Sequence, residues 1–136
     1  MNQIEDLKER EEAAPGYVGR VIRILNDSSI IIDAGKADLR SAKKIQVFSI
    51  LDKVEDLEGN YLGDYYYIKD ELNVIQTEER YSVCQKLTDS KWTGALSPLL
   101  DQASREPGII QIDEQQLSPL PEADDVIHVG DPVKIY

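Results

Sequence analysis

The stretch "YVGRVIRILNDSSIIIDAGK", residues 17–36, decides the fold class of this chain. Two runs rich in β-branched residues flank the turn-forming sequence "NDSS" at residues 26–29, which is the pattern of a β-hairpin. Successive side chains of a strand point to opposite faces, so Ile30, Ile32 and Ala34 share one face of the second run. Because both faces of each run carry apolar residues, we expect the sheet to curl into a small barrel.

The rest of the chain adds further strands to this hairpin. The alternating sequence "KIQVFSILDKV", residues 44–54, predicts a third strand, and Glu58-Gly59-Asn60 predicts a turn after it. Residues 64–87 predict one long bent strand or a pair of strands, and residues 126–136 predict a turn followed by a short last strand. We therefore predict a mainly β fold: a small SH3-like or OB-like barrel of five to seven strands whose last strand closes against the first.

Residues 1–15 are expected to lie outside this barrel, which would occupy residues 16–136. The spacing of Ile4 and Leu7 and the charged residues around them predict a short helix over residues 2–14, and Pro15-Gly16 ends it. A helix with two large apolar anchors is marginal on its own. Two interpretations are therefore open, a solvated arm and a helix that mediates oligomerisation or tethering.

Residues 88–125 form a long excursion before the last strand. They contain four of the six prolines and little periodic sequence, apart from "IIQI" at residues 109–112, which predicts an edge strand. A segment of this length with so little regular pattern indicates either a functional loop or partial disorder.

Length, composition and charge limit the classes of function that are open to this chain. The 136 residues are enough for one domain with a real core, and no apolar run approaches the roughly 18 residues that span a bilayer. The amino terminus has no hydrophobic segment of the signal-peptide type, so we expect a cytoplasmic location. The net charge of −11 disfavours binding to nucleic acids or to anionic membranes.

No pattern of catalytic or metal-binding residues is evident. Cys84 and His128 are the only residues of their types, which leaves no disulfide, no cysteine-based metal site and no catalytic triad. The carboxylates around residues 52–58 lack the spacing of a calcium-binding loop. We therefore expect neither an enzyme nor a bound cofactor or metal.

Aromatic residues are the candidate binding groups. In a strand, Tyr65 and Tyr67 point to one face and Tyr66 to the other, where they either pack across strands or form a partner-binding surface. Trp92, in the excursion, either anchors a partner or folds back over one end of the barrel. The predicted partner-binding residues are Tyr65, Tyr66, Tyr67 and Trp92.

Several glycines, turn residues and apolar residues occur along the chain in an order that is known from one protein family. They are Gly19 and Val21; Ile30, Ile32 and Gly35; Phe48; Asp56, Gly59, Leu62 and Gly63; and Val129, Gly130, Asp131 and Val133. This order resembles the C-terminal domain of the flagellar assembly protein T family and related small bacterial barrels. The resemblance implies a barrel fold with a scaffold or interaction role. It does not carry over a flagellar function, because the export signal and companion domain of that family are missing from this sequence and the proline-rich excursion is added.

The sequence thus predicts a non-catalytic protein-interaction or scaffold domain that binds other protein chains, copies of itself among them. The predicted contact elements are the helix at residues 2–14, the excursion at residues 88–125 and the aromatic set. The alternative is a regulatory module that binds a small ligand or nucleotide in a pocket between the barrel end and the excursion.

Overall fold

The computed structural model describes residues 3–87 and 107–135. Two compact units emerge, one formed by residues 1–87 and 120–136 and the other by residues 88–119. Trp92 lies outside the described residues.

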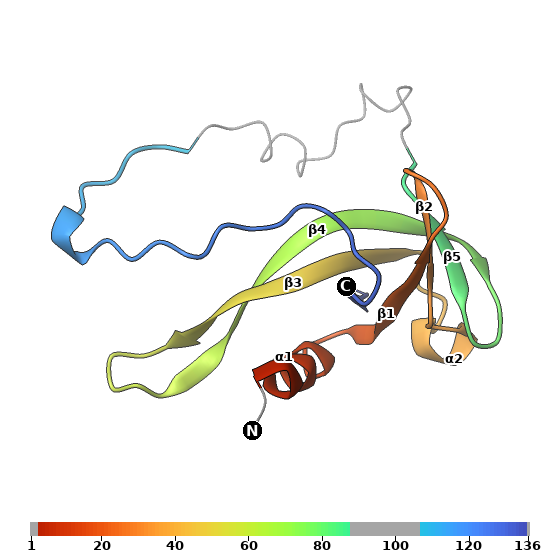
Figure 1. The fold of residues 1–136 in the computed structure, drawn as a ribbon, viewed down its shortest axis with the longest axis horizontal. Helices are drawn as coiled ribbons and strands as arrows, with labels where there is room; N and C mark the ends of the chain where they lie inside the picture. Colours follow the sequence, from red (N-terminus) through yellow and green to blue (C-terminus); the bar gives the residue numbers. More distant parts are fainter. Residues whose placement is uncertain (1–2, 88–106, 136) are drawn as a thin grey trace. The chain divides into compact units, whose positions relative to one another are not determined.

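Among its described residues, the larger unit contains six strands and two helices (Figure 1). In chain order these are α1 (Gln3–Glu12), β1 (Tyr17–Ile24), β2 (Ser29–Ile32), α2 (Lys36–Leu39), β3 (Lys44–Glu55), β4 (Tyr61–Thr77), β5 (Ser82–Gln85) and β6 (Pro132–Lys134). The predicted helix, hairpins and final strand are all present, and the region from residue 64 to residue 87 is a pair of strands. Among the described residues, no helix has the length and apolar character needed to cross a membrane.

The strands form a closed antiparallel barrel in the order β1-β2-β5-β4-β3-β6. Closure is made by β6, in which Val133 pairs with Gly19 of β1 on one side and with Val47 of β3 on the other. The predicted closure of the last strand against the first is therefore confirmed. Because every strand of the barrel has two neighbours, its wall presents no open edge.

One continuous apolar core fills the barrel. Ile30, Ile32 and Ala34, which the alternation of the second strand places on one face, are all buried in it. Full burial of an isoleucine, leucine or valine side chain contributes roughly 1.5–3 kcal/mol to the stability of the folded state. The other core members are Val21, Leu39, Ile45, Val47, Leu72, Cys84 and Val133.

Gly35 shows why a glycine follows the second strand. A Cβ atom built on Gly35 would lie 1.9 Å from the carbonyl oxygen of Glu79, so any side chain would push the two backbone segments apart. The next residue, Lys36, donates its backbone N–H to the carbonyl oxygen of Glu78 at 3.1 Å. The glycine therefore permits the close approach of the segment before α2 to the turn between β4 and β5.

The strands β3 and β4 are much longer than the barrel requires. Pairing with β6 involves only Gln46 and Val47 of β3, and pairing with β5 starts at Asn73 of β4. Residues 48–68 therefore pair only within the β3–β4 hairpin, which extends beyond the other strands as a two-stranded ribbon (Figure 1). We call residues 48–68 the projecting hairpin.

The expected edge strand at residues 109–112 is not formed. Among the described residues of the smaller unit, the regular element is the 3-10 helix η2 (Glu114–Gln116), which Asp113 caps by accepting a hydrogen bond from the Gln115 N–H at 3.0 Å. No strand in the described residues pairs with residues 109–112. β-branched residues alone do not make a strand when no neighbouring strand completes the ladder.

Candidate functional site

The turn at the end of the projecting hairpin is tightly braced. The Asp56 carboxylate accepts hydrogen bonds from the backbone N–H groups of Glu58 and Asn60, at 3.0 and 2.8 Å, and from the Asn60 side-chain amide at 3.0 Å. Gly59 takes the positive φ of +86° that the turn demands. These hydrogen bonds, those from Asn60 above all, lower the pKa of the Asp56 carboxyl below its usual value.

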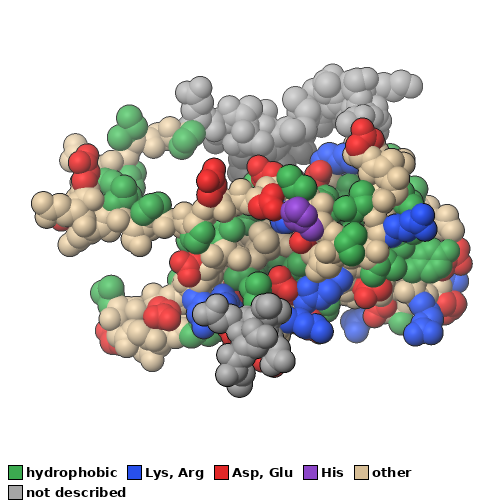
Figure 2. Space-filling view, viewed as in Figure 1, with side chains coloured by type: hydrophobic (Ala, Val, Ile, Leu, Met, Phe, Trp, Pro, Cys, Tyr) green, Lys and Arg blue, Asp and Glu red, His purple; other side chains and the backbone are tan. Residues whose placement is uncertain are grey.

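This braced turn presents apolar side chains to solvent. Leu57, in the middle of the turn, is 102% exposed, and Leu62 at the start of β4 is 65% exposed. Figure 2 shows hydrophobic surface at the far end of the projecting hairpin. We define the hairpin patch as the exposed large apolar residues of the projecting hairpin at and near its turn: Val54, Leu57, Tyr61, Leu62 and Tyr65.

The helix α1 is attached to the same hairpin mainly by charge. Arg10 donates from Nε to the Asp64 carboxylate at 2.8 Å, and only 3% of the Asp64 side chain is exposed. The hydrogen bond to Asp64 is the largest influence that raises the pKa of the Arg10 guanidinium. A second, longer pair joins Lys53 of β3 to Asp6 of α1 at 3.8 Å. These contacts fix α1 beside the hairpin although the helix has few apolar residues.

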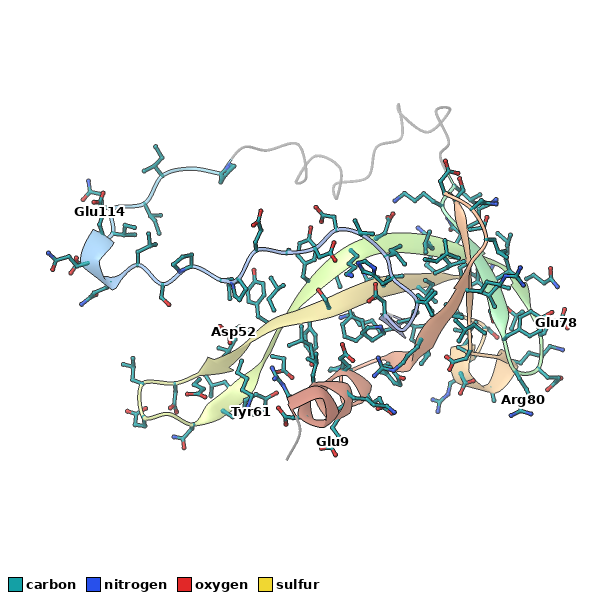
Figure 3. All side chains as sticks on the ribbon, viewed as in Figure 1. Glu9, Asp52, Tyr61, Glu78, Arg80 and Glu114 are labelled. Atoms are coloured by element: carbon teal, nitrogen blue, oxygen red, sulfur yellow. The ribbon has the colours of Figure 1, made fainter. Side chains whose placement is uncertain are left out.

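An open groove of about 580 Å³ remains between α1 and the projecting hairpin. Figure 3 shows Tyr61 on the part of the hairpin nearest to α1, the helix that carries Glu9. The groove is lined from the helix by Asp6, Glu9, Arg10 and Ala13, and from the hairpin by Lys53, Glu55, Tyr61, Asp64 and Tyr66.

The inner end of the groove is supported by a small aromatic cluster outside the barrel core. Phe48 is fully buried, yet it lies outside the core cluster that Val47 joins, as the predicted alternation of β3 requires. The Phe48 and Tyr66 rings pack edge to face with their centres 5.7 Å apart. The Lys134 ammonium lies 5.0 Å from the centre of the Tyr66 ring, and burial raises the pKa of the Tyr66 hydroxyl.

The three consecutive tyrosines therefore have three different environments. Tyr65 is exposed on the hairpin patch, and Tyr66 is half-buried against Phe48. The Tyr67 hydroxyl donates to the carboxylate of Asp125, which lies in residues 120–131, the segment before β6 that we call the returning segment. The three tyrosines thus do not form one continuous surface: Tyr65 is exposed, whereas Tyr66 and Tyr67 contact other parts of the chain.

The returning segment is attached to the barrel through Lys69. The Lys69 side chain is only 4% exposed, and its ammonium donates to the Val126 carbonyl oxygen at 2.7 Å and to the Asp131 carboxylate at 2.9 Å. Beside this attachment, a cavity of about 290 Å³ lies between the barrel end and the returning segment, with Ser29 and Lys86 on one side and Asp125 on the other.

Cys84 and His128, each single in the sequence, lie in different environments. Cys84 is buried in the core, and burial raises the pKa of its thiol to about 12, so it is protonated at neutral pH. His128 is exposed, its Nε2 lies 2.8 Å from an Asp124 carboxylate oxygen, and it lines neither cavity described above. Among the described residues, no group of three or more His, Cys, Asp or Glu side chains could hold a metal ion.

Sequence reasoning missed most of the hairpin patch and the groove. A signal for the patch was present, because a leucine in the centre of the turn-forming sequence "DLEGN", residues 56–60, stands where polar residues are usual. No local signal marks the pairing of Arg10 with Asp64, which are 54 residues apart.

The comparisons with known proteins add no assignment, since neither a protein-family model nor a curated protein sequence matches this chain.

Proposed function

We propose that this chain is a non-catalytic protein-binding domain and that the hairpin patch is its main contact surface. The observation that carries the proposal is the position of Leu57, which is fully exposed at the end of a turn that Asp56 braces. Burial of such a side chain at an interface contributes roughly 1.5–3 kcal/mol, and a turn that is already ordered loses little entropy on binding.

The aromatic residues have separate roles in this proposal. Tyr65 offers a second contact point, because it is exposed on the same hairpin as Leu57 and Leu62 but on the face of β4 opposite Tyr66. Tyr66 supports the hairpin from its packed side, and Tyr67 holds the returning segment. The roles of Trp92 and of the helix α1 as partner contacts remain predictions from the sequence, as do the cytoplasmic location and the likeness to the flagellar assembly protein T family.

The proposal is tested with a double variant, Leu57→Ser with Leu62→Ser. The matched control is Ile75→Ser with Leu87→Ser, which removes two half-exposed apolar side chains of similar size outside the projecting hairpin, one near the end of β4 and one just after β5. Sedimentation velocity over a range of concentrations measures self-association, and quantitative affinity purification from the natural host measures binding to other proteins. We expect the hairpin variant to lose the complexes that the wild type and the control both form. Complexes that survive in the hairpin variant as in the control would refute the assignment.

A second function, binding of a small ligand, is favoured by one specific observation. A cavity of about 290 Å³ lies at the barrel end, and Asp125, the last residue of the excursion, contributes to its lining. A thermal-shift screen of nucleotides and small metabolites tests it, because a ligand that binds only the folded state raises the melting temperature. Substitution of Ser29 by Val should abolish any such shift.

A further inference from the structure

The groove between α1 and the projecting hairpin joins the hairpin patch. Glu55 and Tyr61 are paired across the hairpin immediately before and after the braced turn, and both line the groove. Tyr61 also belongs to the hairpin patch. A partner segment that buries Leu57 therefore reaches the mouth of the groove within a residue or two.

The charges inside the groove are unevenly matched. Both basic residues are already paired, Arg10 with Asp64 at 2.8 Å and Lys53 with Asp6 at 3.8 Å. Glu55 and Glu9 also line the groove, and neither makes an ion pair or a side-chain hydrogen bond within the part of the chain that the structure describes. The carboxylates of Glu9 and Glu55 therefore remain without a basic partner in the groove. Their negative charge has the same sign as the net charge of −11 of the whole chain.

The aromatic lining also favours a cation. The rings of Tyr61 and Tyr66 line the groove, and Tyr66 already accepts the Lys134 ammonium at 5.0 Å from its ring centre. A tyrosine ring beside a carboxylate attracts a lysine or arginine side chain through its face and lets the methylene stem of that side chain pack on it.

We infer that the groove accepts a basic side chain of the bound partner, a lysine or arginine that lies next to an apolar residue docked on the hairpin patch. This inference rests on the proposed protein-binding function and specifies its partner: a segment of a protein chain that combines an apolar anchor with a positive charge. A volume of about 580 Å³ is ample for one arginine side chain together with the backbone that carries it.

The test uses three short acetylated peptides and the full-length protein labelled with nitrogen-15. The first peptide contains two leucine–arginine pairs separated by glycine. In the second, glutamine replaces both arginines, and in the third, serine replaces both leucines. We expect the leucine–arginine peptide to shift the amide signals of Ala13, Tyr61 and Tyr66 and to bind at least about fivefold more tightly than either of the others, which corresponds to about 1 kcal/mol.

Matched variants locate the site. Glu55→Gln should weaken binding of the leucine–arginine peptide about fivefold, whereas Glu79→Gln, which removes the same charge from the turn before β5, should change it less than twofold. Tyr61→Leu keeps an apolar side chain and removes the aromatic face, so it should weaken binding, whereas Tyr81→Leu should not. The nitrogen-15 spectrum of each free variant establishes that the hairpin is folded.

Two outcomes overturn the inference. One is equal binding of the glutamine peptide, and the other is an equal loss of affinity in Glu55→Gln and Glu79→Gln, which would show that the attraction is to the overall negative charge. Either result leaves the protein-binding proposal standing if the Leu57→Ser/Leu62→Ser variant still loses its complexes. The protein-binding proposal itself fails only when that double variant behaves like its control.

Discussion

Arg10 on α1 and Asp64 on β4 form a part-buried, charge-assisted hydrogen bond across 54 residues of sequence, with 2.8 Å between Nε and the carboxylate oxygen. Because the Asp64 side chain is only 3% exposed, this pair is the principal attachment of the helix to the projecting hairpin. Arg10 and Asp64 both line the groove, so this pair joins the two sides of the proposed binding site.

The first prediction concerns this attachment. Arg10→Ala leaves the Asp64 carboxylate buried without its partner, so we expect the free energy of unfolding to fall by about 2 kcal/mol. Urea denaturation followed by circular dichroism measures it. The control is Lys8→Ala on the exposed side of the same helix, which should change the stability by less than about 0.5 kcal/mol. Equal effects of the two substitutions would show that α1 is not held by Arg10.

The second prediction concerns the pKa of Asp56. The hydrogen bonds from Asn60 and Glu58 lower this pKa below the value of about 3.9 of an unperturbed aspartate. A lowered pKa in the folded state means that the turn is stabilised at neutral pH and loses this stabilisation as the pH falls through the lowered pKa. Titration of the carboxyl carbon by NMR measures it directly. Asn60→Ala should move the pKa of Asp56 upward, and an Asp56 pKa at or above 3.9 in the wild type would contradict the bracing of the turn.

The third prediction concerns Cys84. Since burial raises the pKa of its thiol to about 12, a disulfide reagent at pH 8 should modify Cys84 only as the protein unfolds. We expect the rate of modification to increase by orders of magnitude in concentrated urea. Rapid, complete modification of the native protein would mean that Cys84 is accessible and would reopen the question of a thiol-based activity.

The fourth prediction concerns Lys69. Lys69→Met removes the buried ammonium that binds Val126 and Asp131, so we expect a loss of about 2 kcal/mol of stability and faster hydrogen exchange at the amides of Val126 and His128. The control, Lys86→Met, breaks a half-exposed ion pair with Asp70 and should cost less than about 1 kcal/mol. Unchanged exchange at Val126 and His128 in the Lys69 variant would show that the returning segment is held by other contacts.

The barrel was predictable because its signals are local. Alternation along residues 17–36 correctly groups Ile30 and Ile32 on one face, which the structure places in the core, and the sequence "EGN" marks the turn at the end of the hairpin. The closure of the barrel by the last strand, in which Val133 pairs with both neighbouring strands, was also predicted. A short last strand after a glycine turn has few other strand edges with which it can pair.

The candidate site was less predictable because it depends on contacts between distant residues. Alternation places Tyr66 opposite Tyr65 and Tyr67, but it does not show that Phe48 and Lys134 cover Tyr66 or that Asp125 binds Tyr67. Alternation also says nothing of how far β3 and β4 run beyond their neighbours, and this length is what exposes Leu57 and Leu62. The strand expected at residues 109–112 failed for a related reason, since its β-branched residues have no pairing strand among the described residues.

The most direct test of the protein-binding proposal is site-specific photo-crosslinking in the natural host. A photoreactive amino acid replaces Leu57 in one strain and Asp27, in the exposed β1–β2 turn, in another. We predict that illumination at position 57 yields a discrete crosslinked protein, identified by mass spectrometry, that is missing at position 27. Equal crosslinking at both positions, or none at position 57, would contradict the proposal that the projecting hairpin is the contact surface of this domain.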